Sequence, residues 1–414
     1  MKKIIWTLLI VILGTGVAFG AYWYFEQKQR TGNETTPLSV GELFPFGRGT
    51  NTTTDPTPIV PIAETSTPQT PTELPRVWKI SHDRQSGSGI LVRDTETFIR
   101  FVDTATGNVF ENKLGTRDLA RISNTTIPKV KNAIWSQKGD SVILRYTNEN
   151  NAIQTLHGKL VGTTTNTGET TSVQELEGSF LASSITNLSL FGPQDKIFYT
   201  VLNGAGNTVG FAANIDGTKS VRLFESPFRE WSVVWPKAET VVITTKPSGM
   251  VTGFSYLVST RNGTLQRLIG NILGLSTLPA FDLGRIVYST TVSNGTSARL
   301  HSFNVNTNAD GILGNTLAEK CVWMKDNLNV VCAVPKNFPS GTYPDDWYKG
   351  KVSFADTFVM YNTDTNRSMT VLDPAPIARE DIDATHLALD PNEQFLTFTN
   401  KKDGSLWALR VTTN

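Results

Sequence analysis

The sequence contains few of the residues from which metal sites are usually built. Its 414 residues include only two cysteines and four histidines, and the histidines stand far apart at positions 82, 157, 301 and 386. A zinc site needs about four closely spaced ligands, and no such grouping occurs. The sequence also lacks a P-loop, an H-E-x-x-H motif and an EF-hand loop. We therefore expect no metal and no cofactor.

Charge is scarce as well. Charged residues make up 18% of the chain, and 38 basic against 37 acidic residues leave a net charge of +1. This balance offers no excess of positive charge to attract nucleic acid. A G-x-S-x-G nucleophile elbow is missing, and adjacent acidic residues on a strand or loop point apart, which excludes a ready acid/base pair. We expect a protein that is not an enzyme.

The one long hydrophobic run covers residues 4–25, directly after Lys2 and Lys3. At about 1.5 Å per residue, a helix of this length crosses the core of a bilayer. Aromatic residues at both ends of the run are typical of membrane anchors. We predict a short cytoplasmic tail (1–3), a single-pass transmembrane signal anchor (4–25) and a chain that continues outside the cell. A cleaved signal peptide is the alternative.

Residues 26–75 form a predicted linker rich in threonine and proline. The stretch 31–75 holds eight of the twenty prolines. Such a composition buries too little apolar surface to fold and favours extended conformations, so we predict a disordered stalk. One apolar island contains Leu43, Phe44 and Phe46. It is a candidate docking motif, or else it packs on the chain's own domain or on the bilayer.

From residue 76 to 414 the sequence predicts strands almost throughout. Alternating runs such as SVILRY (141–146) and TVVITT (240–245) are separated by turn residues. One block recurs: a short apolar strand that ends in a large apolar residue, a polar turn, and a strongly apolar strand. That position recurs at spacings of 42 to 66 residues and is occupied by Trp78, Trp135, Phe191, Trp235, Phe281, Trp323 and Leu389.

Four short strands repeated seven times predict an all-β fold, a seven-bladed β-propeller. A single blade cannot bury both of its faces, whereas a closed ring of blades does so. Six or eight blades are also compatible with the spacing. A pair of β-sandwiches is the main alternative.

Two of the blocks, WSQKGDSVILRY (135–146) and LDPNEQFLTFTNKKDGSLWALRV (389–411), resemble the WD-like repeat of TolB-type propellers. The second departs from that repeat at Pro391-Asn392-Glu393, where the family tends to have Pro-Asp-Gly. The resemblance implies a binding scaffold, extracytoplasmic in the TolB case, or a non-catalytic domain that gates an attached hydrolase. It specifies fold and not function.

A long loop, 335–354, is predicted between the second and third strands of blade six. Its aromatic rings beside fixed charges are typical of a recognition patch. The candidate binding loop consists of Phe338, Tyr343, Asp345, Asp346, Trp347 and Tyr348. In the alternative, Trp347 and Tyr343 fold back to cap the blade. A second insertion, at about 161–180, is predicted to be a mobile loop.

Cys321 and Cys332 are predicted on the first and second strands of blade six. A hairpin centred on a two-residue turn at Asp326-Asn327 places them opposite each other, within reach of a disulfide after a small adjustment. The same turn puts them in the hydrogen-bonded register, where Cα atoms are farther apart. An oxidising compartment would keep the bond. Two reduced, buried cysteines are the alternative.

These observations together predict a membrane-anchored, outward-facing propeller in the cell envelope, with its N-terminus inside, that binds a protein, peptide or glycan. The alternatives are a carbohydrate-active enzyme that uses the central channel and a structural cell-surface protein. Three or more carboxylates at the axis would favour the enzyme. A channel lined by apolar and hydroxyl residues would exclude it.

Overall fold

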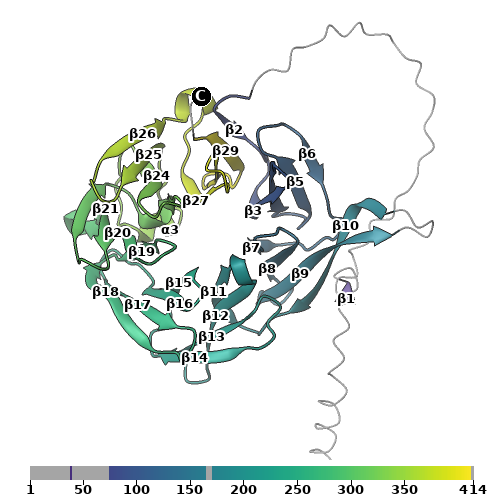
Figure 1. The fold of residues 1–414 in the computed structure, drawn as a ribbon, viewed down its shortest axis with the longest axis horizontal. Helices are drawn as coiled ribbons and strands as arrows, with labels where there is room; N and C mark the ends of the chain where they lie inside the picture. Colours follow the sequence, from purple (N-terminus) through teal and green to yellow (C-terminus); the bar gives the residue numbers. More distant parts are fainter. Residues whose placement is uncertain (1–37, 40–73, 165–169, 412–414) are drawn as a thin grey trace, which may run out of the picture.

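The computed structural model describes residues 38–39, 74–164 and 170–411. They form a ring of seven antiparallel sheets (Figure 1), and in six of them the number of strands is four. The remaining sheet has a fifth strand at its outer edge. The predicted seven-bladed propeller is therefore confirmed, and the pair of sandwiches is wrong.

Each blade contains four strands, which run in chain order from the axis outward in blades one to six. Blade one contains β3 (Gln85–Arg93), β4 (Glu96–Asp103), β5 (Val109–Lys113) and β6 (Leu119–Arg121). Blade two contains β7 (Val130–Trp135), β8 (Ser141–Thr147), β9 (Ile153–Thr164) and β10 (Thr170–Phe180). Blade three contains β11 (Ile185–Phe191), β12 (Lys196–Leu202), β13 (Thr208–Asn214) and β14 (Val221–Ser226).

Blade four contains β15 (Trp231–Lys237), β16 (Thr240–Thr245), β17 (Thr252–Ser259) and β18 (Leu265–Leu273). Blade five contains β19 (Ser276–Pro279), β20 (Arg285–Val292), β21 (Ser297–Asn304) and β22 (Asp310–Gly314). Blade six contains β23 (Cys321–Trp323), β24 (Asn329–Pro335), β25 (Asp356–Asn362) and β26 (Ser368–Leu372). Blade seven contains β27 (Ala384–Leu389), β28 (Phe395–Asn400), β29 (Leu406–Arg410) and β2 (Val77–Lys79).

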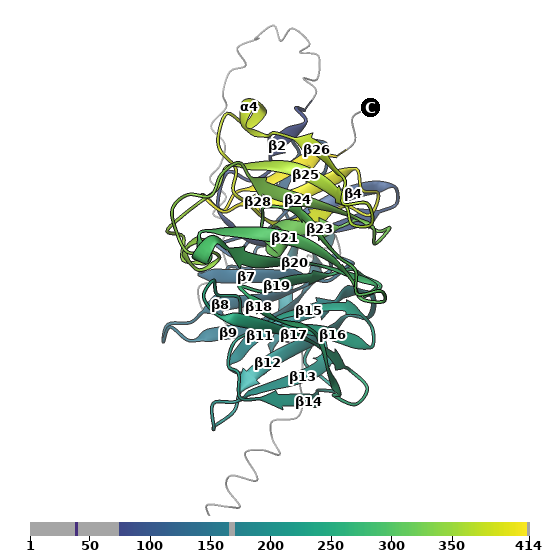
Figure 2. The ribbon, with the colours of Figure 1, turned by 90° about the vertical axis from the view of Figure 1, so that its left-hand side faces the viewer.

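The ring is closed by the first strand of the domain. β2 pairs antiparallel with β29 and so becomes the outer strand of blade seven. Trp78 therefore does not belong to the first strand of blade one, as the repeat pattern predicted; that place is taken by β3. The pairing of β2 with β29 joins the two ends of the ring by backbone hydrogen bonds. A blade whose four strands were all consecutive in the chain would lack this link. Figure 1 shows β2 beside β29, and Figure 2 shows the ring edge-on.

In blades two to seven, the second strand has at least four successive buried residues and is covered on both faces by the neighbouring sheets. Four successive residues are buried in β8 and in β16, which are the predicted runs at 141–146 and 240–245. Strands that are covered on both faces have nearly continuous apolar sequences, which explains why these runs were recognisable.

Two of the recurring tryptophans join neighbouring blades through their indole groups. Trp135 and Trp323 are buried at the ends of β7 and β23. Each indole N–H donates to a carbonyl on the inner strand of the preceding blade, from Trp135 to Gly87 at 3.3 Å and from Trp323 to Leu278 at 3.0 Å. Phe281 does not take this role, contrary to the repeat pattern: β19 ends before it, and 52% of its surface is exposed.

Residues 161–164 and 170–180 belong to the paired strands β9 and β10, so the predicted mobile loop is wrong for these residues. β9 and β10 pair along most of their length, with Leu160 opposite Leu176. Leu176 is 1% exposed and packs in a core cluster with Leu156 and Trp135. These buried leucines favour a strand although threonine and glycine dominate the composition. The short strand β1 (Leu38–Ser39) extends the same sheet by pairing with β10.

Candidate functional site

The inner strands of all seven blades enclose a channel along the ring axis. The cavity has a volume of about 1450 Å³, and its wall includes residues of β3, β7, β11, β15, β19, β23 and β27. Pockets for small ligands are usually about 300–1,000 Å³. The channel therefore has room for an extended segment of a larger partner.

The channel wall is positively charged. It contains Arg84, Lys131, Lys237 and Lys401, and no Asp or Glu is among its residues. The first three are exposed and make no ion pair with a carboxylate in the described part of the chain. Sequence analysis did not identify these residues. Lys131 and Lys237 do stand on the first strands of recurring blocks, which a propeller places nearest the axis.

Lys401 is held against the long loop of blade six. Its Nζ donates to the carbonyl oxygen of Trp347 at 2.7 Å and lies 5.1 Å from the centre of the indole ring. Desolvation by the surrounding protein lowers the pKa of Lys401. The loop and the channel wall are thus in direct contact at this lysine.

His386 faces the channel from an irregular part of β27. The pairing register shifts between Thr385 and Ala388, and His386 has a left-handed φ of 52°. Positive φ is uncommon outside glycine, and bulges that re-aim a side chain are frequent near functional sites. The side chain is open to the channel, but the surrounding protein desolvates the imidazole and lowers its pKa. Nδ1 lies 3.3 Å from the hydroxyl oxygen of Thr385, so Nε2 is the ring nitrogen that can form a hydrogen bond with an occupant.

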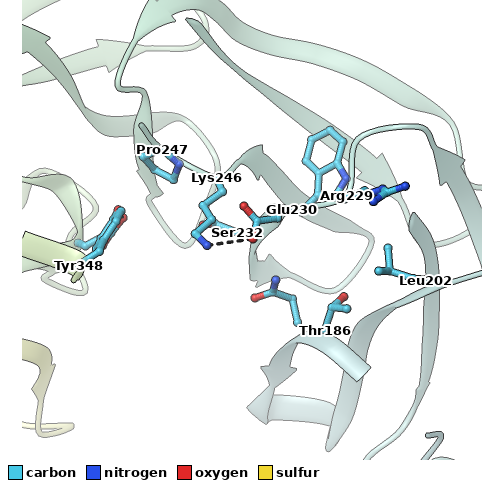
Figure 3. Close-up of a pocket in the computed structure, with 11 residues that line it drawn as sticks. Thr186, Leu202, Arg229, Glu230, Ser232, Lys246, Pro247 and Tyr348 are labelled. Carbon is cyan, nitrogen blue, oxygen red and sulfur yellow. Dashed lines mark hydrogen bonds and ion pairs between the residues drawn. The ribbon is translucent and has the colours of Figure 1, made fainter. Parts of the chain in front are cut away.

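A second cavity has a volume of about 760 Å³. The beginning of β11 lines this cavity and the rest of β11 lines the channel, which places the second cavity at one mouth of the channel. Figure 3 shows Lys246 and Glu230 paired there, with 3.1 Å between Nζ and Oε1. The Tyr348 hydroxyl donates to the carboxylate of Glu319, which also accepts from Ser276 Oγ at 3.1 Å. Burial raises the pKa of Glu319.

The loop that follows β24 folds back and buries most of its aromatic rings. Tyr343 is 0% and Trp347 4% exposed, and the ring of Phe354 lies 5.6 Å from Tyr343 and 6.0 Å from Trp347. Phe338 joins the cluster 4.9 Å from Tyr343. The interpretation in which these rings cap the blade is the one that the geometry supports. An exposed recognition patch built on Tyr343 and Trp347 is wrong, because burial of the rings stabilises the folded loop.

The acidic pair of this loop holds it in place. Asp345 opens the single turn of helix α3 (Asp345–Tyr348) and accepts from the Ser248 hydroxyl at 3.0 Å and from the Gly249 N–H at 2.7 Å. Asp346 accepts a backbone N–H of its own loop at 2.9 Å. Among the six residues of the candidate binding loop, Tyr348 is the one that lines the cavity at the channel mouth.

Cys321 and Cys332 are opposite each other on β23 and β24. The structure joins them in a disulfide, with 4.0 Å between the Cα atoms. This short distance belongs to the non-hydrogen-bonded register. The expected hydrogen-bonded register is wrong because the turn is longer than two residues: Met324 donates to Asn329, which leaves 325–328 as the loop.

Four predictions fall wholly or largely on residues that the structure does not describe. They are the cytoplasmic tail at 1–3, the anchor at 4–25, the docking motif of Leu43, Phe44 and Phe46, and the linker at 26–75, of which 38–39 and 74–75 are described. Within 38–39, 74–164 and 170–411, no helix is long and apolar enough to span a membrane. In the same residues, no three His, Cys, Asp or Glu side chains are placed to hold a metal ion.

No protein-family model matches the sequence, and no curated protein is similar to it in sequence. Solved structures do share the fold. The chain is similar to an oligogalacturonate lyase in complex with manganese, with a TM-score of 0.55 and 11% identity over 81% of this chain and 93% of that one. It is similar to the tricorn protease, with a TM-score of 0.51 and 9% identity over 84% of this chain and 35% of that one.

TolB from Acinetobacter baumannii is another similar structure, with a TM-score of 0.42 and 13% identity over 64% of this chain and 60% of that one. The resemblance to WD-like propellers holds at the level of the fold, because the chain forms seven blades of at least four strands. At these identities the comparisons say nothing about substrates or partners.

Proposed function

We propose that this protein is a binding scaffold of the cell envelope that takes a negatively charged, extended segment of its partner into the central channel. The observation that carries the proposal is the channel wall, to which all seven blades contribute and which includes four cationic side chains and no carboxylate. The partner is a protein, a peptide or a glycan that offers such a segment.

The physical basis is electrostatic. A cleft lined by charge of one sign concentrates the potential and attracts ligands of the opposite sign. Lys131 and Lys237 stand on β7 and β15, so an occupant can meet positive charge on two blades. Apolar residues such as Leu188, Val234 and Leu387 also line the wall. A segment that alternates acidic and apolar groups fits this wall best.

Binding can be measured with the full chain in detergent micelles. The probes are a fluorescent peptide of alternating Glu and Leu, the same peptide with Lys in place of Glu, polygalacturonate, and neutral dextran. We expect one of the two acidic probes to bind, with an affinity that falls as salt is added, and the basic and neutral probes not to bind. Equal binding of all four, or no binding of either acidic probe, would overturn the proposal.

Charge reversal locates the site. Lys131→Glu and Lys237→Glu should each weaken the acidic probe about tenfold or more, because each replaces an attraction by a repulsion. The matched control is Lys219→Glu, at an exposed position in the turn after β13. Loss of binding in the control to the same extent would place the site outside the channel.

The proposal includes residues 4–25 as a single-pass anchor, with the N-terminus inside and the ring outside the cytoplasm. Its support is the length and apolarity of this run. A disulfide is also typical of an oxidising compartment. Protease added to intact cells should remove the ring. A ring that resists until the cells are lysed would contradict the outward orientation.

A carbohydrate-active enzyme in the channel is the competing hypothesis. Most glycoside hydrolases need a carboxylic acid and a carboxylate facing the substrate. The described channel wall supplies neither, and the acidic side chains at its mouth, Glu230 and Glu319, are bonded to Lys246 and Tyr348. Incubation with polygalacturonate distinguishes the two hypotheses. New chain ends would show that the protein cleaves the glycan, and catalysis rather than binding would then be its function.

A further inference from the structure

A lysine and two aspartates are enclosed together where blades six and seven meet. Lys320 and Asp383 are 0% exposed and Asp356 is 1% exposed. Lys320 Nζ lies 2.6 Å from Asp383 Oδ1, 2.9 Å from Asp356 Oδ2 and 2.9 Å from the carbonyl oxygen of Ala384. Lys320 directly precedes β23, Asp356 begins β25, and Asp383 directly precedes β27. Folding therefore brings together three groups from distant parts of the chain.

The triad contains one more acid than base. With both carboxyl groups ionised it would carry a net negative charge in a region closed to bulk solvent, which is unfavourable. Burial raises the pKa of Asp356, and a proton on this carboxyl group would make the triad neutral. Asp356 Oδ1 has no hydrogen-bond partner in the described part of the chain. The carboxyl group of Asp356 is thus held against the lysine with one oxygen unused.

The carboxyl group of Asp383 is polarised on the side away from the lysine. Trp347 Nε1 lies 3.0 Å from Oδ2 and 3.2 Å from Oδ1, and the N–H of Phe354 donates to Oδ2 at 3.1 Å. Donors placed in this way stabilise negative charge that develops on a carbonyl oxygen. The rings of the same two residues each lie 5.1 Å from Lys320 Nζ and help to exclude water.

We propose that Lys320 and Asp383 become joined by an intramolecular isopeptide bond after folding, and that Asp356 transfers the protons. The ammonium group first passes a proton to the carboxylate of Asp383, which gives an amine and a carboxylic acid. Nζ attacks Cγ and the C–N bond forms. Asp356 takes a proton from Nζ and gives its own to the departing hydroxyl, so the C–O bond breaks and water leaves. The ammonium and the carboxylate become an amide and one water molecule, and Asp356 is regenerated.

The bond would connect two blades. Lys320 and Asp383 are 63 positions apart, and the neighbour of Lys320 in the chain is Cys321. The disulfide ties β23 to β24 within blade six, while the isopeptide bond would tie the beginning of the same strand to blade seven. Neither link depends on the proposed ligand of the channel.

A tryptic digest of the full chain, reduced, alkylated and analysed by mass spectrometry, tests the proposal directly. In the absence of the bond, trypsin cleaves after Lys320 and releases 300–320, 321–325 and 380–401 as separate peptides. With the bond, Lys320 is not a substrate for trypsin. Residues 300–325 then appear joined to 380–401, at the sum of the two peptide masses less one water. Complete recovery of the separate peptides from folded protein would overturn the proposal.

Variants separate the bond from a purely ionic triad. Lys320→Arg keeps the charge and should give no linked peptide. Asp356→Asn nearly keeps the shape but cannot transfer the protons in the same way, and the linked peptide should form about a hundredfold more slowly or not at all. In Asp383→Asn, ammonia leaves instead of water, so a linked chain would have the same mass as the linked natural chain.

The matched control is Asp364→Asn, an exposed carboxylate in the turn between β25 and β26 of blade six, which lies outside the triad and should leave the bond intact. Circular dichroism establishes that each variant is folded before digestion. Linking in Asp356→Asn at the natural rate would refute the role of Asp356. A peptide of the linked mass in Lys320→Arg would show that the assignment to Lys320 is wrong.

Discussion

Closure of the ring by β2 predicts that Trp78→Ala opens blade seven while the other blades stay folded. Trp78 is 6% exposed, and its ring meets that of Phe395 edge to face with 6.0 Å between the centroids. It shares an apolar cluster with Leu406 and Ala408 of β29. Its indole N–H has no hydrogen-bond partner among the residues described, so the substitution removes packing alone. β2 pairs with β29 through only three residues, and the loss falls on this short contact.

Replacement of a buried tryptophan by alanine costs about 3–5 kcal/mol, a large part of the ~5–15 kcal/mol that stabilises a typical domain. Since about 1.4 kcal/mol corresponds to a factor of ten, detachment of β2 becomes about a hundred to a few thousand times more frequent. Amide hydrogens of β29 that bond to β2 should exchange faster by this factor. Those of β16, in blade four, should keep their protection.

Hydrogen exchange measured by mass spectrometry on the full chain reports both regions, through peptides that cover 406–410 and 240–245. Trp231→Ala is the matched control, because Trp231 is 4% exposed on β15 and its loss should affect blade four rather than β29. Unchanged exchange in β29 of Trp78→Ala, or an equal rise in every blade, would refute the idea that β2 closes the ring as a separable element.

Three further predictions concern blade six. Cys321 and Cys332 should resist alkylation in native protein until a reductant is added, and reduction should cost about 3 kcal/mol for a loop of this length; free alkylation without reductant would contradict the disulfide. Burial raises the pKa of Tyr343 to about 12. Because the pKa of tyrosine in the unfolded chain is about 10, the stability that Tyr343 contributes is complete below pH ~10 and is lost as the pH rises to ~12. The midpoint of urea unfolding should therefore fall between these pH values. It should fall less in Tyr343→Phe. Asp345→Ala leaves the Gly249 N–H without its acceptor and should cost about 1–3 kcal/mol, seen as faster proteolysis within 336–355; unchanged proteolysis would show that this bond does not hold the loop.

The propeller was predictable because its repeating contacts leave a repeating sequence. β8 and β16 are covered on both faces, so their residues form continuous apolar runs. Trp135 and Trp323 recur because each makes the same bond to the preceding blade. The opposed cysteines were predictable for a similar reason, since pairing in a hairpin follows from local sequence alone.

Features that depend on distant partners were not predictable in this way. Trp78 is buried on an outer strand. A tryptophan at the end of an inner strand is buried as well, so the sequence pattern could not show whether Trp78 belongs to blade one or to blade seven. Tyr343 and Trp347 have the composition of an exposed patch, and only the surface that covers them shows that they are core residues. The triad of Lys320 draws on three separate strand ends, and no local spacing marks it.

The position of β2 also bears on the order in which the protein is made. Among the strands of the seven four-stranded blades, β2 leaves the ribosome first. Yet Arg76, beside it, bonds to the carbonyl oxygen of a residue 334 positions later. Until β29 has been synthesised, Val77 and Trp78 are an apolar segment without a partner sheet. Blades one to six can fold as they emerge, but the ring can close only after translation of its last strand. Throughout that interval the nascent chain presents an open strand edge, the kind of surface that chaperones bind and that promotes aggregation.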